Sequence, residues 1–389
     1  MPTPLDPAAL RPHYRAFLTG GRGAREPRDR VLLTGHSHQA WPDVARAAVL
    51  EAFDDAAALV DDKWGRAFAA ADAVRLGVAT RIGCTADEIA LAPNTHELVA
   101  RFLSCLDLRR RPHLVTTAGE FHTIDRQLRR LAEEGVEITW VDPREPATLA
   151  ARIASAVRGD TAAVLCSTVL FQTSAIVPGV DELVRTVRAR GVEVLLDAYH
   201  AFSFVPFRVP AGAFLVAGGY KYAQLGEGNC FLRVPPDTAL RPVYTGWYAG
   251  FGALADPRDG GRVPYPARPA ERFAGSTYDP TSHYRARAVF GFFDAQGMTV
   301  ERLRATSLRQ TARILAGLEG FDVHTPRDDA ARAGFVAVRV RDAKAVVDGL
   351  RAQGILVDVR GDLVRLGPAP YLTDDEIDRG VAALRALAR

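Results

Sequence analysis

The stretch "GGYKYAQLGEGNC", residues 218–230, follows the apolar run "AFLVA" at 213–217 and ends in a glycine-rich loop. It contains Lys221, one of three lysines in a chain whose lysines and arginines total 49. Arginine is always protonated in proteins and cannot act as a nucleophilic amine, whereas lysine can. Lys63 and Lys344 lie in patterns typical of solvated helices. Lys221 is therefore the candidate for amine chemistry.

On both sides of Lys221, apolar runs of strand length alternate with helical patterns. The strand-like runs are 88–93, 113–118, 137–142, 162–170, 193–199 and 213–219. The helical patterns between them are 95–106, 124–135 and 180–191, and a longer one precedes them at 43–82. Such alternation with apolar strands predicts an α/β fold with a large, doubly wound, mostly parallel sheet.

The pattern changes near residue 285. Two helical stretches at 284–297 and 300–320 precede two strand-like runs that flank a further helix, at 335–340, 343–354 and 364–370. The sequence therefore predicts an irregular N-terminal arm at 1–30, a large α/β domain at 31–285, and a smaller C-terminal α+β domain at 286–389.

Composition argues against several classes of protein. The 389 residues are 48% hydrophobic with a net charge of +3, and no basic stripe stands out, so neither nucleic acid nor a membrane surface is an expected partner. No apolar run approaches the length of roughly 18 residues that a membrane span needs. The four cysteines are scattered, which argues against disulfides or a zinc site and favours the cytoplasm.

In open α/β sheets, ligands bind at the carboxyl ends of the strands, where chemically useful side chains gather in this sequence. Those that follow predicted strands are Asn94, Thr95, His96, Phe121, Gln172, Asp197, His200 and Lys221. Pyridoxal 5'-phosphate (PLP) needs an amine that holds it as an imine, which Lys221 can supply. It also needs a carboxylate beside its pyridine nitrogen, a role that suits Asp197.

The remaining residues suit the other parts of the same cofactor. Thr95 and His96 begin a helix, and a helix N-terminus favours a phosphate. Phe121 could stack on the ring, while Gln172 and His200 could contact its hydroxyl. The predicted cofactor is therefore PLP, with no metal: His36 and His38 form an H-x-H pair without an evident third ligand.

The order of these motifs resembles the class V aminotransferase superfamily of fold-type I PLP enzymes. "DAYH" at 197–200, followed by "YKYAQLGEG" at 220–228, is most similar to kynureninase. The resemblance implies phosphate contacts from Tyr220 and Trp247, and a carboxylate grip on the substrate by Arg365. It further implies a homodimer, in which the segment with Ser276 and Thr277 reaches the active site of the other subunit.

The chain departs from the kynureninase pattern on the substrate side. His122 stands where that family has a proline, and "HSHQ" at 36–39 replaces "NSLG", which adds His36 and His38. We expect these three histidines to face the substrate.

The expected activity is therefore that of a PLP-dependent enzyme that acts on an α-amino acid through an external aldimine. Kynureninase-like hydrolytic Cβ–Cγ cleavage is the leading reaction. The alternatives are an aminotransferase, a β-eliminating lyase, or a non-catalytic PLP-binding protein. Cysteine desulfurase chemistry is not expected, because that family uses a mobile cysteine in its small domain and no cysteine follows Cys230 here.

Overall fold

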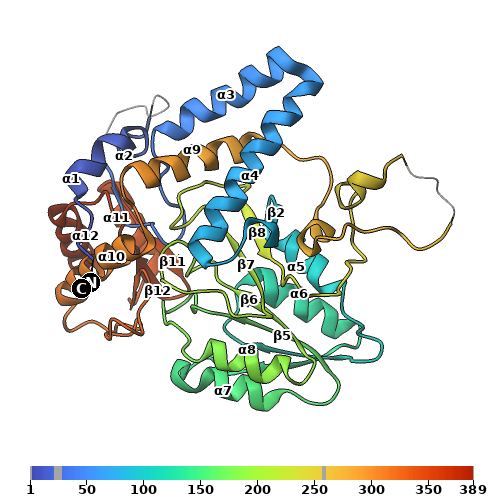
Figure 1. Ribbon diagram of the computed structural model, residues 1–389. Helices are drawn as coiled ribbons and strands as arrows, with labels where there is room; N and C mark the ends of the chain where they lie inside the picture. Colours follow the sequence, from blue (N-terminus) through green and yellow to red (C-terminus); the bar gives the residue numbers. More distant parts are fainter. Residues whose placement is uncertain (1, 22–28, 256–259, 389) are drawn as a thin grey trace.

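A seven-stranded sheet forms the centre of the computed structural model, which describes residues 2–21, 29–255 and 260–388 (Figure 1). Its spatial order is β2-β8-β7-β6-β5-β3-β4. The strands are β2 (Ile89–Ala92), β3 (His113–Thr117), β4 (Glu137–Val141), β5 (Thr161–Ser167), β6 (Glu193–Asp197), β7 (Phe214–Gly218) and β8 (Cys230–Arg233). Neighbours from β7 to β4 pair in parallel, and β8 alone runs against the others, pairing antiparallel with both β7 and β2. The predicted mostly parallel sheet is confirmed.

The sheet is buried on both faces, which explains why its strands are apolar without a polar side. In β5, Val164 and Cys166 belong to one hydrophobic core, while Ala163 and Leu165 belong to the other. Successive side chains of a strand point to opposite faces, so a strand covered on both sides needs apolar residues at every position.

Helices of the large part cover the two faces in separate sets. The helices are α3 (Val44–Leu59), α4 (Lys63–Ile82), α5 (Thr95–Leu103), α6 (His122–Glu133), α7 (Pro146–Ala156), α8 (Val180–Arg188) and α9 (Thr281–Ala295). Apolar residues of α5 and α6 share one core with the sheet, and those of α4, α7, α8 and α9 share the other. The result is a three-layer arrangement, with α3 packed along α9 on the outside.

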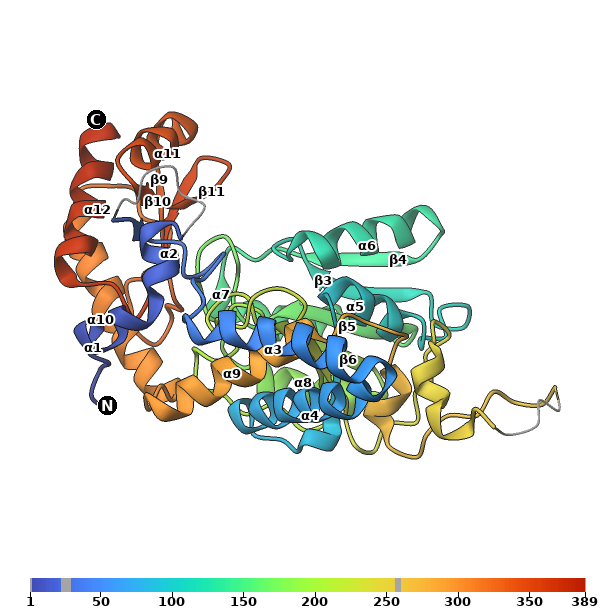
Figure 2. The ribbon, with the colours of Figure 1, turned by 90° about the horizontal axis from the view of Figure 1, so that it is seen from above.

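The C-terminal elements form a smaller unit at one end of the molecule, beside the large sheet (Figure 2). They are α10 (Val300–Gly317), β9 (Val336–Arg339), α11 (Ala343–Ala352), β10 (Ile355–Leu356), β11 (Asp358–Arg360), β12 (Leu363–Leu366) and α12 (Asp374–Leu387). Strands β11, β12 and β9 make an antiparallel sheet in that order. The short strand β1 (Val31–Leu32) pairs in parallel with β10. The predicted domain boundaries remain proposals. Strand β1 lies at the start of the predicted large domain, but it pairs with a strand of the C-terminal unit.

The N-terminal residues are more regular than the irregular arm that the sequence predicted. They form α1 (Pro7–Leu10), a 3₁₀ turn (Arg11–Tyr14) and α2 (Arg15–Thr19). Asp6 caps α1 by accepting a hydrogen bond from the Ala8 amide at 2.9 Å, a cap that sequence reasoning overlooked.

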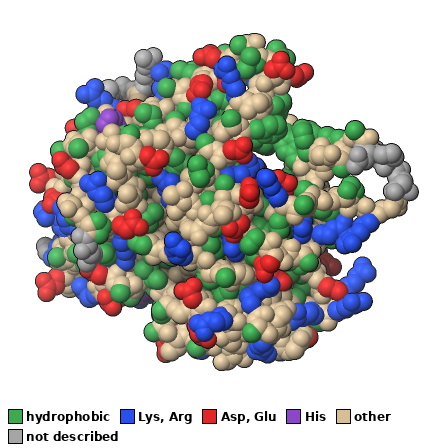
Figure 3. Space-filling view, in the orientation of Figure 1, with side chains coloured by type: hydrophobic (Ala, Val, Ile, Leu, Met, Phe, Trp, Pro, Cys, Tyr) green, Lys and Arg blue, Asp and Glu red, His purple; other side chains and the backbone are tan. Residues whose placement is uncertain are grey.

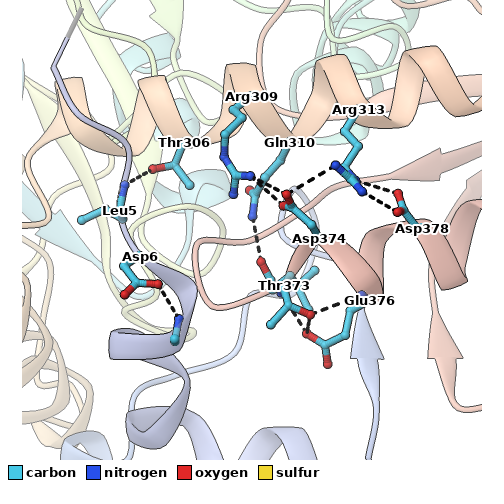
Figure 4. Close-up of polar contacts among 12 residues, drawn as sticks. Leu5, Asp6, Thr306, Arg309, Gln310, Arg313, Thr373, Asp374, Glu376 and Asp378 are labelled. Carbon is cyan, nitrogen blue, oxygen red and sulfur yellow. Dashed lines mark hydrogen bonds and ion pairs between the residues drawn. The ribbon is translucent and has the colours of Figure 1, made fainter.

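The N-terminal segment is held on the C-terminal unit by polar contacts. The Leu5 amide donates to Thr306 Oγ1 at 2.8 Å, and Arg11 pairs with Glu376 at 2.7 Å. Figure 4 shows Leu5 beside α10, and it shows Arg313 on α10 paired with Asp374 and Asp378 on α12. These contacts join the first residues of the chain to its last helices.

A segment between β8 and α9 extends from the body of the molecule (Figure 1). It contains the 3₁₀ stretches Trp247–Ala253 and Pro269–Phe273 and exposes large apolar side chains, among them Tyr244, Trp247 and Phe251. On the face drawn in Figure 3, acidic and basic side chains are interspersed. Within the described residues, no helix is both long and apolar enough to cross a membrane.

Candidate active site

Two neighbouring strands place the predicted amine and carboxylate at one edge of the sheet. Asp197 is the last residue of β6, and Lys221 follows the end of β7 by three residues. The two strands pair in parallel, so both chain ends emerge on the same side. Gly218 is required at this point, because a Cβ there would lie 2.2 Å from the Tyr199 hydroxyl.

Lys221 is buried among aromatic rings with one polar neighbour. Its side chain is 5% exposed, and Nζ lies 2.7 Å from His200 Nε2. Nζ also lies 5.4 Å from the ring centre of Phe121, 4.7 Å from that of Tyr199 and 5.7 Å from that of Tyr220. Burial lowers the pKa of Lys221 to about 7, against the opposing charge of Asp197. A neutral, nucleophilic amine is therefore well populated near pH 7.

His200 accepts a hydrogen bond from Lys221 and does not compete with it for a proton. Burial and the Lys221 charge hold the pKa of His200 well below its ordinary value, so the imidazole is neutral. Lys221 Nζ then donates to His200 Nε2, which leaves the proton of the ring on Nδ1. Nδ1 is buried without a hydrogen-bond partner among the described residues. A ligand with an acceptor would satisfy it.

Asp197 is a buried carboxylate with one structural hydrogen bond. Its Oδ1 accepts from the Tyr199 amide at 2.8 Å. Burial raises the pKa of Asp197, while the Tyr199 amide and the Lys221 charge act in the opposite direction. A carboxylate in this setting binds strongly to a protonated ring nitrogen, because the positive charge compensates for the solvation that the carboxylate lost on burial.

A cavity of ≈ 270 Å³ joins these groups. Its walls include seven of the sequence-predicted site residues, namely Asn94, Thr95, Phe121, Asp197, His200, Tyr220 and Lys221. Thr95 begins α5, and Asn94 caps that helix by accepting from the Glu97 amide at 3.0 Å. The cavity thus combines an amine, a carboxylate, a flat aromatic wall and a helix N-terminus. These features fit the aldehyde, the ring nitrogen, the ring face and the phosphate of PLP.

Other predicted residues lie outside this cavity. His96 and Gln172 are exposed, on α5 and in the turn after β5. His122 is exposed too, but its ring packs 5.2 Å from that of Phe121, beside the cavity wall. None of these three lines the cavity in this structure, and their roles toward a ligand remain proposals.

The three predicted site residues in the segment between β8 and α9 form a separate group. Trp247, Ser276 and Thr277 are all exposed, and Trp247 Nε1 donates to Thr277 Oγ1 at 3.3 Å. Ser276 and Thr277 line a second, larger cavity of ≈ 1130 Å³. Both cavities include Glu227 and Gly228 in their walls, so the two lie side by side.

The side chains of the two histidines in the H-x-H pair lie in different surroundings. His38 is exposed at the rim of the smaller cavity, where it stacks on Tyr220 at 5.2 Å and lies 3.5 Å from Glu227. His36 is fully buried, 3.5 Å from Asp358 Oδ2, and burial lowers its pKa to about 3. No group of three or more possible metal ligands occurs in the part of the chain that the structure describes.

Arg365 already has partners. It is 2% exposed, donates through Nη1 to the Phe171 carbonyl, and pairs through Nη2 with Asp358. Arg360 also donates to Asp358, at 2.8 Å. The sequence predicted that Arg365 binds a substrate carboxylate, and this role stays a prediction. The guanidinium lies behind Phe171, which itself lines the cavity.

Sequence reasoning assigned no role to a second buried carboxylate, Glu120. It accepts hydrogen bonds from Thr117 Oγ1 at 2.5 Å, from the Ser167 amide at 3.1 Å and from Ser167 Oγ at 2.5 Å. Burial raises its pKa to about 7, against those hydrogen bonds. Its position three residues after the end of β3, next to Phe121 in the chain, was the available signal, since the strand ends of this sheet form the site.

The chain is similar to proteins named kynureninase. A family model described as "Kynureninase C-terminal domain" matches residues 302–384. A kynureninase of Xanthomonas axonopodis pv. citri is 27% identical over 376 residues, and the match covers 88% of this chain and 87% of that protein.

Solved structures show the same fold at low identity. A C-DES mutant with glycine covalently linked to its PLP cofactor superposes with a TM-score of 0.83 at 17% identity, covering 96% of this chain and 99% of that chain. An apo cysteine desulfurase from Thermococcus onnurineus gives a TM-score of 0.80 at 18% identity, covering 100% and 99%. The predicted fold-type I fold is confirmed, as is the resemblance to the class V aminotransferase superfamily and, within it, to kynureninase.

Proposed function

We propose that this chain is a PLP-dependent enzyme that acts on an α-amino acid, with kynureninase-like hydrolytic cleavage of a Cβ–Cγ bond as its reaction. The observation that supports this most directly is the buried pair of Lys221 and Asp197 around one cavity. An amine with a pKa of about 7, a buried carboxylate and a helix N-terminus are costly to assemble without a ligand. PLP needs all three.

When bound, PLP supplies an electron-accepting ring that makes the bonds at the substrate Cα easier to break. Lys221 would hold the cofactor covalently and, once released by the substrate amine, would move the Cα proton. Its low pKa suits both tasks, because the neutral amine can accept a proton near pH 7. Asp197 would keep the ring nitrogen protonated through its negative charge.

The other walls of the cavity would position the cofactor. Phe121 offers an aromatic face, and the free Nδ1–H of His200 offers a donor. Thr95 and its neighbours at the start of α5 offer backbone N–H groups to the phosphate. Arg365 would bind the α-carboxylate of the substrate, as the kynureninase resemblance implies.

We further propose a homodimer with its active sites at the interface. Trp247, Ser276 and Thr277 are exposed and lie apart from the cavity around Lys221 in one chain. A second copy could bring these residues to that cavity. Sedimentation analysis tests this proposal: a dimer is expected, and a monomer that remains fully active would contradict it.

The first experiment on function follows the colour and the products. The purified protein should bind PLP and become yellow, and it should convert kynurenine to anthranilate. A protein that stays colourless after reconstitution would contradict the proposed cofactor. A yellow protein without turnover of kynurenine or 3-hydroxykynurenine would contradict only the leading reaction.

The products separate the remaining reactions. A panel of amino acids would then show whether keto acids accumulate, as for an aminotransferase, or whether a β substituent is lost, as for a lyase. Spectral changes without any product would indicate a non-catalytic PLP-binding protein.

A further inference from the structure

One carboxylate organises the charged groups behind the cavity wall. Asp358 pairs with Arg365 through Oδ2 and with Arg360 through Oδ1, and its Oδ2 lies 3.5 Å from His36 Nε2. Burial alone would raise the pKa of Asp358, but His36 and the two arginines hold it well below its usual range. Asp358 is therefore ionised at neutral pH.

Two of the three guanidinium nitrogens of Arg365 already have partners. Its Nη1 is bound to the Phe171 carbonyl and its Nη2 to Asp358. Its Nε is buried without a hydrogen-bond partner within residues 2–21, 29–255 and 260–388. An unpaired buried donor is costly, and the cost is larger for a charged group. The free Nε indicates that an acceptor belongs there.

The guanidinium lies close to the amine site through a short chain of contacts. The Arg365 Cζ lies 5.2 Å from the centre of the Phe335 ring, and that ring lies 5.8 Å from the ring of His200. His200 in turn contacts Lys221 at 2.7 Å. The charge of Arg365 lowers the pKa values of both Lys221 and His200, after the larger effect of burial.

We propose that Asp358 is a positioning residue for recognition of the substrate carboxylate, because it fixes Arg365 by Nη2 and leaves Nε for the incoming carboxylate. This inference rests on the proposed function, in which Arg365 binds the α-carboxylate of an amino acid. Arginine forms strong, directional hydrogen bonds with carboxylates, and their geometry depends on how the planar guanidinium is oriented. Asp358 supplies that orientation through its ion pair with Nη2.

The first test measures binding to the chain without cofactor. We would titrate 3-phenylpropanoate, a carboxylate without an amino group, into wild type and Asp358→Asn by calorimetry. The amide keeps the shape of the side chain but removes its charge. We expect binding to weaken about tenfold in the variant. Asp378→Asn is the matched control, because Asp378 also pairs with an arginine, Arg313, but on the surface (Figure 4); its affinity should not change.

The second test separates positioning from a purely structural role. With the loaded enzyme, Asp358→Asn should raise KM for the amino acid about tenfold and change kcat less than about threefold. KM for the corresponding amine without a carboxylate should not change. Asp358→Glu keeps the charge and should recover part of the loss. If Asp358→Asn fails to fold, which thermal unfolding would reveal, the glutamate variant carries the same measurement.

Two results would overturn the role of Asp358. Equal or tighter binding of 3-phenylpropanoate by Asp358→Asn would show that Asp358 does not position Arg365 or that it competes with the carboxylate. Absence of binding by the wild type would show that Arg365 offers no carboxylate site. A chain that never retains PLP would contradict the proposed function instead, and the calorimetric comparison would still be readable.

Discussion

Two groups of charges lie near the Phe335 ring, and they are balanced in different ways. Around Lys221, the nearest polar neighbour is a neutral histidine, and burial lowers the pKa of the amine to about 7. Around Asp358, two arginines surround one carboxylate, and its pKa is held well below the usual range. The first group can change its protonation state near neutral pH, and the second cannot.

The difference shows how charged groups removed from water can serve two purposes. Desolvation disfavours a charge unless a close opposite charge compensates for it. The incompletely compensated amine is suited to chemistry, because it can gain and lose a proton. The compensated carboxylate is suited to holding another group in place. The following predictions test this comparison, beginning with the largest expected effect.

Replacing Lys221 with alanine should remove the amine that can change its protonation state near neutral pH. We expect activity to fall by about 10⁴-fold or more, since the amine that moves the proton is lost. Lys344→Ala is the control, because Lys344 is an exposed residue paired with Asp348 on the same helix. Steady-state assays should find the control unchanged. Comparable activity of Lys221→Ala and wild type would contradict the assignment.

Asp197→Asn should have the next largest effect. The amide keeps the shape of the side chain but cannot stabilise a positive charge on the ring nitrogen. We expect kcat to fall about 10²–10³-fold. Asp294→Asn, at an exposed position near the end of α9, provides the comparison. A loss confined to KM would mean that Asp197 affects binding without affecting the chemical step.

The pH dependence of PLP uptake should report the protonation state of the Lys221 amine directly. Only neutral Lys221 is nucleophilic, and its pKa is about 7. The rate at which the cofactor-free chain takes up PLP should therefore fall about tenfold for each pH unit below that value and level off above it. Stopped-flow absorbance measures this rate. A rate that continues to rise toward pH 10 would show an ordinary lysine and would remove the contrast between the two groups.

Replacing Glu120 should have the smallest effect of these changes, and the quantity affected is the unfolding free energy. Its pKa is raised from 4.5 to about 7, so between these values the folded chain holds a proton that the unfolded chain has lost. The unfolding free energy of the wild type should thus decrease as pH rises through this window. Glu120→Gln removes that contribution, so its unfolding free energy should rise relative to that of the wild type by on the order of 3 kcal/mol between pH 4.5 and pH 8. Denaturant titrations at both pH values measure the difference.

The cofactor side of the site could be predicted because it depends on the ends of strands. Asp197 and Lys221 each follow an apolar strand, and parallel neighbours bring such ends together. The burial that lowers the pKa of Lys221 follows from the same apolar strands. Little information beyond the order of elements was needed, which also explains why the fold was predictable.

The substrate side could not be predicted in the same way. The pairing of Arg365 with Asp358 depends on a turn between two short antiparallel strands, and the buried position of His36 depends on its contacts with Asp358 and Phe335. Both are tertiary contacts without a local pattern. By contrast, α12 had a local signal that was overlooked: Thr373 and Glu376 form a capping box at its start.

The central claim is that Lys221 is the amine that holds PLP, and one measurement tests it directly. The reconstituted protein is reduced with borohydride, digested, and mapped by mass spectrometry. We expect the cofactor mass on the peptide that contains Lys221, and on neither Lys63 nor Lys344. Cofactor on another lysine, or on none, would contradict the account.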